Sequence, residues 1–292
     1  MLISLLNKTK MLLKAVPLFV YVRRKIWSYN NNRDYFAKLN IHKTFPAFVP
    51  SSSGKTRNLT DLTVQSINQT FPLIESLLAS LSINIPIITV DEFNKRIDSH
   101  EQSTRLKVLF DQYGSDKASI HNYHLVYGLV LNDSLAIKNI LEVGMGTNNL
   151  DVASNMGAAG KPGASLRAFR DFCLNAEIYG ADIDTRILFK EDRIQTFYVD
   201  QTDSKTFEQL KNELPESFDL VIDDGLHSPN ANIATLDFGL QIVKKNGWVV
   251  VEDIRIESLS IWKVIYHLIS ENFEPFIIQS KSAYMFVARR LH

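Results

Sequence analysis

Six side chains that can bind a cation or move a proton lie in two short stretches of this 292-residue chain. The first stretch is Phe218-Asp-Leu-Val-Ile-Asp-Asp-Gly-Leu-His227, and the second is Gly247-Trp-Val-Val-Val-Glu252-Asp253. Each is an apolar run that ends abruptly in carboxylates. Because an unpaired carboxylate is costly to bury, these ends should face water, a cation or a reacting group. With a histidine three residues after Asp224, the pattern predicts a metal-assisted active site.

The carboxylates are placed so that they can share one ion. Asp224 follows one predicted strand and Glu252-Asp253 ends another, and neighbouring strands lie about 4.8 Å apart. Three carboxylates without a cation would repel one another and raise their pKa values. A hard, oxygen-ligated ion such as Mg²⁺ relieves that repulsion and keeps positions open for water and substrate. His227, on the following turn, could take a proton from a hydroxyl near neutral pH. The alternative is that these acids cap helices or face solvent, and that His227 is hydrogen-bonded to its own loop.

Apolar runs of strand length alternate with amphipathic helical segments from residue 106 onward. Near-continuous apolar strands of this kind indicate a parallel sheet covered on both faces. We therefore predict a doubly wound, Rossmann-like α/β domain at 106–292 with about seven strands and a ligand site at their carboxyl ends. The predicted strands are Asn139–Val143, Glu177–Ala181, Ile194–Val199, Phe218–Ile222, Trp248–Val251, Pro275–Ile278 and Tyr284–Ala288. The predicted helices are Ser165–Cys173, Ser204–Asn212, Asn230–Lys244 and Ile261–Ser270.

Three successive strand ends predict a nucleoside ligand. The first strand runs into Gly144-Met-Gly146-Thr-Asn148, where glycines allow a ligand to approach the backbone. The second ends in Asp182-Ile-Asp184, and a carboxylate there can accept from both hydroxyls of a ribose. The third ends in Asp200-Gln201, which suits the edge of an adenine. Any one of these could be a tight turn or a solvated strand end, but the three in order favour a nucleoside.

These motifs resemble those of class I S-adenosylmethionine-dependent methyltransferases. Asp223-Asp-Gly-Leu-His227 with Glu252-Asp253 is more specifically similar to the macrocin and mycinamicin sugar O-methyltransferases, which carry an Asp-Asp-Gly-Ser-His motif, a Glu-Asp pair and a bound magnesium ion. The resemblance covers residues 108–292. It implies methyl transfer from S-adenosylmethionine to a hydroxyl of a sugar or glycan, assisted by Mg²⁺.

The resemblance also implies roles for individual residues. Asp224, Glu252 and Asp253 would hold the metal, and His227 would act as the catalytic base beside Asp224. The segment Tyr113-Gly-Ser-Asp116-Lys117 resembles one that covers the cofactor. Residues carried over as cofactor contacts are Glu142, Gly144, Gly146, Asn148, Asp182, Asp184, Asp200, Gln201, Asp223 and Lys117.

The chain departs from the family pattern at two places. Leu226 replaces the usual serine, and the stretch Asn149–Gly163 lengthens the connection after the glycine turn, which should reshape the pocket. His121 and His124, with Tyr123 and Tyr127, are expected to be structural or pocket-lining rather than catalytic.

Two other functions stay open. One is a related metal-dependent hydroxylase or oxygenase, although the two-His-one-carboxylate pattern of non-haem iron is absent from the sequence. The other is a non-catalytic nucleoside-binding subunit. The presence of Asp224, His227, Glu252 and Asp253 argues against that function.

Residues 1–105 are predicted to form a mainly helical N-terminal extension. A helix is expected at Thr60–Leu81 with a break or kink near Pro72, and another from the capping box Thr89-Val-Asp-Glu92 to about Phe110. Met1–Arg33 holds seven basic residues and no acid, so this arm either packs on its own domain or a second subunit of a homo-oligomer, or rests on an anionic membrane face. The basic residues are Lys8, Lys10, Lys14, Arg23, Arg24, Lys25 and Arg33.

The amino-acid composition limits the kinds of binding partner and the cellular compartment that we expect. The chain holds 32 Lys+Arg and 32 Asp+Glu residues, a balance that gives no support for a nucleic-acid partner. Its single cysteine, Cys173, excludes a disulfide framework and a cysteine zinc site within one chain. We expect a cytoplasmic protein, with membrane association confined to the N-terminal arm.

Overall fold

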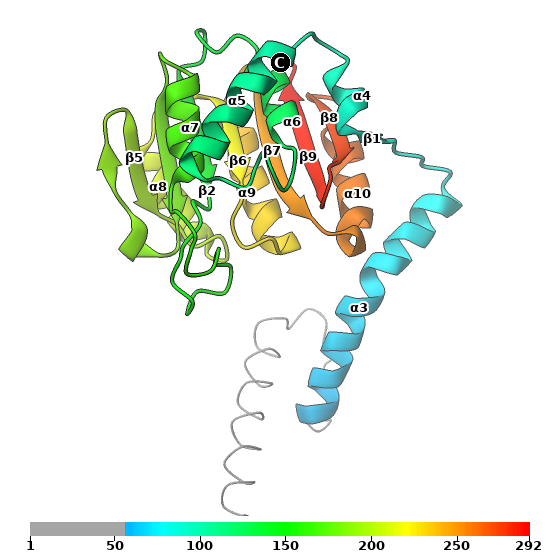
Figure 1. The fold of residues 1–292 in the computed structure, drawn as a ribbon. Coiled ribbons are helices and arrows are strands. Elements are labelled where there is room, and N and C mark those ends of the chain that lie inside the picture. Colours follow the sequence, from blue (N-terminus) through cyan, green and yellow to red (C-terminus); the bar gives the residue numbers. More distant parts are fainter. Residues whose placement is uncertain (1–55) are drawn as a thin grey trace, which may run out of the picture. The chain divides into compact units, whose positions relative to one another are not determined.

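A nine-stranded sheet forms the centre of the protein (Figure 1). The computed structural model describes the backbone of residues 56–292 and side chains from residue 68 onward. The strand order is β1-β8-β9-β7-β6-β2-β3-β5-β4. The strands are β1 (Ile87–Thr89), β2 (Asn139–Val143), β3 (Glu177–Asp182), β4 (Lys190–Glu191), β5 (Ile194–Tyr198), β6 (Phe218–Asp223), β7 (Val243–Ile254), β8 (Phe273–Gln279) and β9 (Tyr284–Arg290).

Five consecutive strands of the sheet are parallel, and their order reverses beside β2. From β2 the chain proceeds outward to β3 and β5 on one side, then returns to β6 and β7 on the other. Strand β9 is antiparallel to both β7 and β8, and β4 is antiparallel to β5. A ligand site in such a sheet lies at the carboxyl ends of the strands, where the order reverses. The predicted doubly wound fold is confirmed.

All seven predicted strands are present, but the count of seven is wrong. The two additional strands are β1 and β4, which have three and two residues and lie at opposite edges of the sheet. Runs this short carry no readable apolar alternation, so sequence periodicity does not detect them.

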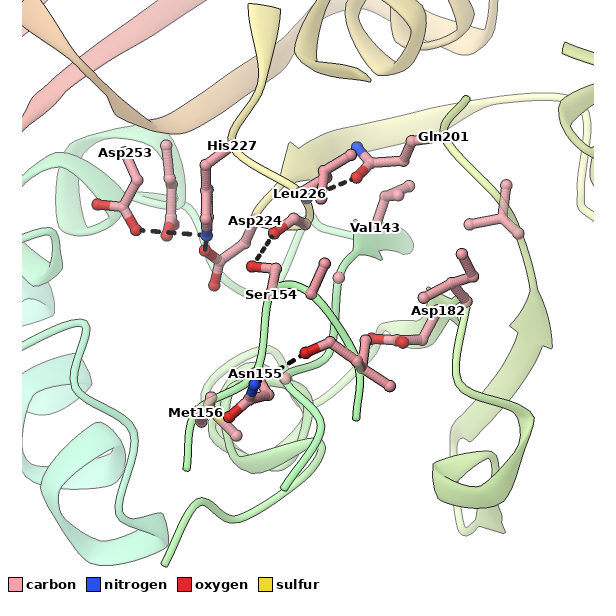
Figure 2. Close-up of a pocket in the computed structure, with 18 of the residues that line it drawn as sticks. Val143, Ser154, Asn155, Met156, Asp182, Gln201, Asp224, Leu226, His227 and Asp253 are labelled. Atoms are coloured by element: carbon pink, nitrogen blue, oxygen red, sulfur yellow. Dashed lines mark hydrogen bonds and ion pairs between the residues drawn. The ribbon is translucent and has the colours of Figure 1, made fainter. Parts of the chain in front are cut away.

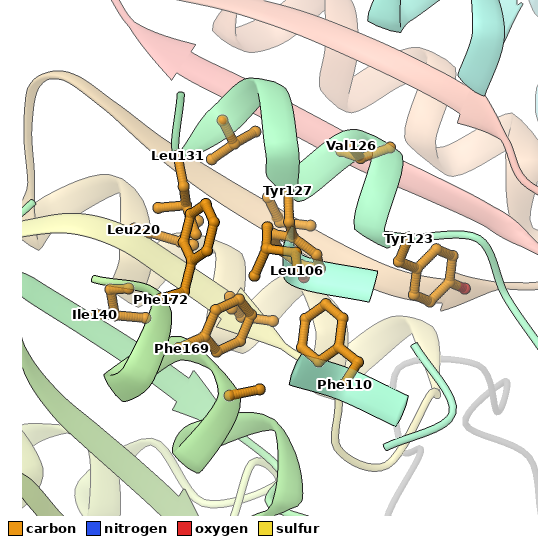
Figure 3. Close-up of a cluster of buried hydrophobic side chains, with 14 of the residues drawn as sticks. Leu106, Phe110, Tyr123, Val126, Tyr127, Leu131, Ile140, Phe169, Phe172 and Leu220 are labelled. Carbon is orange, nitrogen blue, oxygen red and sulfur yellow. The ribbon is translucent and has the colours of Figure 1, made fainter. Parts of the chain in front are cut away.

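Helices cover both faces of the sheet. Side chains alternate along each strand, so Ile140 and Leu220 face one helical layer, whereas Leu141 and Val221 face the other. Figure 3 shows the first layer, in which Phe110, Tyr127 and Phe169 pack edge to face, with ring centroids 5.3–6.4 Å apart. That layer contains α4 (Val90–Asn94), α5 (His100–Tyr113), α6 (His124–Val130) and α7 (Ala164–Phe172), and the second contains α8 (Ser204–Glu213), α9 (Pro229–Ile242) and α10 (Leu259–Ile269).

The segment before the sheet differs from the prediction in two respects. Helix α3 (Thr56–Ser80) continues through Pro72 without the expected break. The predicted capping box is present, because Glu92 N donates to Thr89 Oγ1 at 3.2 Å and Thr89 N donates to the Glu92 carboxylate at 2.7 Å. However, the single helix expected to reach Phe110 is wrong, since α4 ends at Asn94 and α5 begins at His100. Ser99 Oγ donates to Asn94 Oδ1 at 2.5 Å, so a side-chain bond spans the break between the two helices.

The compact unit that carries the sheet runs from Leu77 to His292. The boundary expected between residues 105 and 106 falls inside α5, and β1 already pairs with β8. Residues 77–105 therefore belong with the sheet. The basic arm predicted at Met1–Arg33 lies outside the described residues. Within the described part of the chain, none of the helices combines the length and apolarity needed to span a bilayer.

Candidate active site

The register of the sheet brings the glycine turn and the acidic strand ends to one edge. Val143 is paired with Asp223, and Asp223 with Val251, so Gly144, Asp224 and Glu252 follow at the same level. The backbone after β6 is also hydrogen-bonded to the end of β2, since Asp224 N donates to Val143 O at 2.8 Å. The convergence expected from the sequence is thus present in the structure.

Gly144 fits this position because it lacks a side chain. Its φ is +91°, in the left-handed region that disfavours other residues. A Cβ atom at Gly144 would lie 2.2 Å from the carbonyl oxygen of Asp224. The glycine therefore permits the turn after β2 to contact the backbone of the candidate metal-binding residue.

A cavity of about 600 Å³ opens at this edge. Figure 2 shows acidic, amide and imidazole groups around it, contributed by the ends of β3, β6 and β7 and by the loops that follow β2 and β5. Five of the predicted cofactor contacts line it, namely Gly144, Gly146, Asp182, Asp200 and Gln201. The other five are not lining residues of this cavity, namely Glu142, Asn148, Asp184, Asp223 and Lys117.

Two of these carboxylates hold the loops instead. Asp184 is buried and accepts from Thr147 Oγ1 at 2.6 Å and from Asn149 Nδ2 at 2.8 Å, while Asn148 between them is exposed. Asp223 is fully buried and accepts from the side-chain amide of Gln201 at 2.8 Å. Their contacts fix the glycine turn and the loop after β6.

Gln201 contacts the cavity while its amide group is already hydrogen-bonded at both ends. Its Nε2 donates to Asp223 and Thr235, and its Oε1 accepts from Leu226 N at 2.8 Å. Asp182 is similar, since its two oxygens accept from Met145 N and Asp184 N, each at 2.9 Å. Both residues therefore line the wall with polar groups that already have partners in the protein.

Lys117 lies beneath the acidic strand ends as a buried ammonium. Its Nζ is 2.6 Å from Asp224 Oδ2, 2.6 Å from Glu252 Oε2 and 3.2 Å from Glu142 Oε1. Burial alone would lower the pKa of Lys117, but attraction to Asp224, Glu252 and Glu142 outweighs it and holds that pKa well above its usual value. Lys117 is thus an internal countercharge between β2, β7 and the residue that follows β6.

A group of donors that could hold one metal ion consists of Asp224, His227 and Asp253, whose ligand atoms lie within 4.8 Å of one another. His227 Nε2 is 3.9 Å from an oxygen of each aspartate. Glu252, predicted to be the third ligand, is 1% exposed. Glu252 lines the same cavity, but its carboxylate accepts from Lys117 and from the hydroxyl of Tyr127, so both of its oxygens already have protein partners.

The charges of the group suit a divalent ion. Burial raises the pKa of Glu252 well above its usual value, Lys117 offsets part of that rise, and Asp224 and Asp253 add repulsion. The single ammonium group of Lys117 cannot balance all of these carboxylates. A hard divalent cation would neutralise the negative charge that remains. His227 Nδ1 is buried without a hydrogen-bond partner among the described residues. Because a metal-ligating histidine almost always has its other nitrogen bonded, this favours the two aspartates as ligands and His227 as a base.

The stretch after the glycine turn forms a further wall of the cavity. Residues Val152–Met156 line it consecutively. Ser154 Oγ donates to Gly225 O at 2.8 Å, and Asp151 is paired with Arg186 at 3.0 Å. The sequence indicated that this insertion reshapes the pocket, and the structure places it between the glycine turn and the loop after β6.

The sequence placed Asp116 in a segment expected to cover the cofactor, and His121 among residues expected to be structural or pocket-lining rather than catalytic. Both line the cavity from the loop between α5 and α6. In the same loop, Tyr123 Oη donates to Asp253 Oδ1 at 2.5 Å. The signal available in the sequence was the spacing of His121 and Tyr123, two ring-bearing residues separated by one position. Their position beside β7 depends on tertiary structure, which this spacing does not encode.

Comparison with known proteins defines the class to which this fold belongs. The chain matches no protein-family model. It is 29% identical over 147 residues to 8-demethyl-8-alpha-L-rhamnosyl tetracenomycin-C 2'-O-methyltransferase of Streptomyces olivaceus, covering 49% of this chain and 36% of that protein. It is 37% identical over 93 residues to mycinamicin VI 2''-O-methyltransferase of Micromonospora griseorubida, covering 32% and 23%. The chain thus spans about a third or less of the curated relatives it matches.

Among solved structures, the chain is similar to the MycE methyltransferase in complex with Mg and SAH, with a TM-score of 0.53 and 22% identity. The match covers 64% of this chain and 55% of that one. The fold is therefore that of class I methyltransferases. Within that class, part of the sequence is similar to O-methyltransferases named for mycinamicin VI and demethylmacrocin.

Proposed function

We propose that this protein transfers a methyl group from S-adenosylmethionine to a hydroxyl of a sugar or glycan with the help of Mg²⁺. The observation that carries the proposal is the contact between the glycine turn and Asp224, which places a metal-binding group beside a nucleoside site in one cavity. The names of the curated relatives and the Mg and SAH in the MycE complex support this reading.

In this proposal the donor lies across the carboxyl ends of β2, β3 and β5. The ribose would bind at Asp182 and the adenine edge at Asp200, both of which line the cavity. The sulfonium end would approach the backbone at Gly144, where no side chain intervenes. That arrangement leaves the opposite side of the cavity, beside Asp224 and Asp253, for the acceptor.

The acceptor hydroxyl would be deprotonated at His227. Asp224 and Asp253 would hold Mg²⁺, which when bound lowers the pKa of the hydroxyl and orients it. The acceptor oxygen attacks the methyl carbon, the carbon–sulfur bond breaks, and its electron pair stays on sulfur. His227 Nε2 takes the proton, and the two aspartates at 3.9 Å stabilise the imidazolium that forms. Holding oxygen, methyl carbon and sulfur in line supplies much of the rate.

The two alternatives have less support. The group formed by Asp224, His227 and Asp253 contains one histidine and two carboxylates, the reverse of the usual set in non-haem iron oxygenases. A non-catalytic nucleoside-binding subunit would have no need of these acids or of His227 in the cavity.

The donor site is tested by two alanine substitutions at glycines with positive φ. Gly144 and Gly157 have φ values of +91° and +74°, but a Cβ at Gly157 meets no atom within 4 Å. Calorimetry should show S-adenosylhomocysteine binding to the wild type, a loss of at least about tenfold in Gly144→Ala, and little change in Gly157→Ala, because only the first adds a clash. A wild-type protein that binds no S-adenosylhomocysteine, with or without Mg²⁺, would end the proposal.

The wall formed by Val152–Met156 should contribute to donor affinity. Replacing Ser154 with alanine removes its bond to Gly225 O, and one such bond is worth about 0.5–1.5 kcal/mol. We expect S-adenosylhomocysteine to bind roughly two- to tenfold more weakly to Ser154→Ala. Asn155→Ala is the matched comparison, because the neighbouring Asn155 amide donates to Val152 O and accepts from Gly157 N, both within its own loop. Equal affinity in Ser154→Ala and the wild type would show that this contact does not hold the wall.

A further inference from the structure

The loop between α5 and α6 brings to the cavity a carboxylate and an imidazole that the proposed chemistry does not use. These are Asp116 and His121, and both line the cavity with the candidate metal group. His121 Nδ1 lies 3.5 Å from Asp253 Oδ1. The pair is therefore adjacent to the aspartate on the side where the acceptor must bind.

His121 is held rigidly in this position. Its ring stacks on Tyr123 with centroids 5.0 Å apart and an interplanar angle of 25°. Its Nδ1 is 2.6 Å from Ser282 Oγ, in the turn between β8 and β9. The same turn holds the loop, since Lys281 N donates to Asn122 Oδ1 at 3.1 Å. A side chain held by a stacked ring and a hydroxyl, on a loop that is itself anchored, can position a ligand group without first losing much conformational freedom.

The spacing of the pair leaves room for a hydroxyl. His121 Nε2 is 3.5 Å from Asp116 Oδ2, which is too long for a good hydrogen bond. The Asp116 side chain is 51% exposed, so its oxygens remain accessible from the cavity. A hydroxyl is both a donor and an acceptor, and it can accept from the imidazole N–H while donating to the carboxylate. An ether or an apolar group could satisfy only one partner or neither.

We propose that Asp116 and His121 bind a second hydroxyl of the acceptor, adjacent to the one that is methylated. This inference rests on the proposed function and narrows it to acceptors with neighbouring hydroxyls, such as a pyranose ring. One hydroxyl contacts His227 and Asp253, and its neighbour contacts the Asp116–His121 pair. Asp116 and His121 are thus positioning residues that select a diol over an isolated alcohol.

The test uses Mn²⁺ as a paramagnetic ion in the full-length protein saturated with S-adenosylhomocysteine. Methyl α-L-rhamnopyranoside serves as a diol probe and cyclohexanol as a single-hydroxyl probe, both observed by ligand NMR. The wild type should broaden the sugar resonances saturably, whereas His121→Ala and Asp116→Asn should each weaken sugar binding about tenfold, the loss expected for one good hydrogen bond. Cyclohexanol should show equally weak broadening in all of these proteins.

His267→Ala is the matched control, because His267 is an exposed histidine of α10 and not a lining residue of the cavity. Affinities for S-adenosylhomocysteine and Mn²⁺, measured separately, should stay within about twofold of the wild type in Asp116→Asn, which alters no contact of the metal group. Unchanged sugar affinity in Asp116→Asn and His121→Ala would overturn the inference, as would a wild type that binds S-adenosylhomocysteine and Mn²⁺ but broadens neither probe. Failure to bind S-adenosylhomocysteine would instead overturn the proposed function, and this inference with it.

Discussion

Replacing Asp253 with asparagine is expected to lower the affinity for Mn²⁺ at least about 100-fold, because a direct carboxylate ligand should matter at least as much as the outer-shell partners of a metal site. The backbone should tolerate the change. Asp253 has a φ of +53°, and asparagine is among the few residues that adopt this region readily. Its amide oxygen can still accept from Tyr123 Oη, which now donates to Asp253 Oδ1.

Electron paramagnetic resonance of free Mn²⁺ during a titration measures this loss directly. Asp192→Asn is the matched control, since the Asp192 side chain is 91% exposed and lies outside the cavity. Affinity for S-adenosylhomocysteine should be nearly unchanged in both variants. Undiminished Mn²⁺ affinity in Asp253→Asn would rule out this residue as a ligand. An equal loss in Glu252→Gln would restore Glu252 to the ligand set that the family resemblance implies.

The sheet could be predicted from the sequence because its central strands are long and buried on both faces. Near-continuous apolar runs such as Phe218–Ile222 exceed any competing helical pattern. The edge strands β1 and β4 gain their structure from pairing with β8 and β5 rather than from their own residues. The break between α4 and α5 is likewise spanned by a side-chain bond between Asn94 and Ser99, which periodicity does not encode.

The site was predictable where a residue's position follows from the strand that carries it. Asp182, Asp224 and Asp253 reach the cavity because parallel strands present their carboxyl ends at one edge. The position of a strand end does not determine the direction in which a carboxylate side chain points. Asp184 and Asp223 turn into the protein and bind its loops, although each lies within two residues of an acid that lines the cavity.

The least predictable element is the cation beneath the site. Lys117 precedes β2 by more than 20 residues, and only the folded chain brings it to three carboxylates on three strands. Charge pairing between such distant segments leaves no local pattern. The sequence alone therefore predicts the acids, whereas their positively charged partner is identified only by the tertiary structure.

Replacing Lys117 with methionine is expected to lower the free energy of unfolding by about 3–5 kcal/mol, the usual cost of removing one partner from a buried ion pair. Methionine retains the length and apolar stem of lysine, so the packing changes little. The loss arises because Glu142 and Glu252, both essentially inaccessible to solvent, keep their charge-bearing carboxyls without the ammonium. Urea unfolding followed by circular dichroism at neutral pH gives the value.

Lys107→Met is the matched control, because it removes a lysine from an exposed ion pair rather than from a buried one. Lys107 pairs with Asp111 one helical turn away, and their side chains are 50% and 39% exposed, so its removal should cost only about 0–1 kcal/mol. Mg²⁺ should stabilise Lys117→Met more than it stabilises the wild type, because an ion bound only to the folded protein then neutralises a larger excess of carboxylate charge. Equal stability losses in the two variants would contradict the buried countercharge. A Lys117→Met protein indifferent to Mg²⁺ would show that the ion and the ammonium act on separate sets of carboxylates.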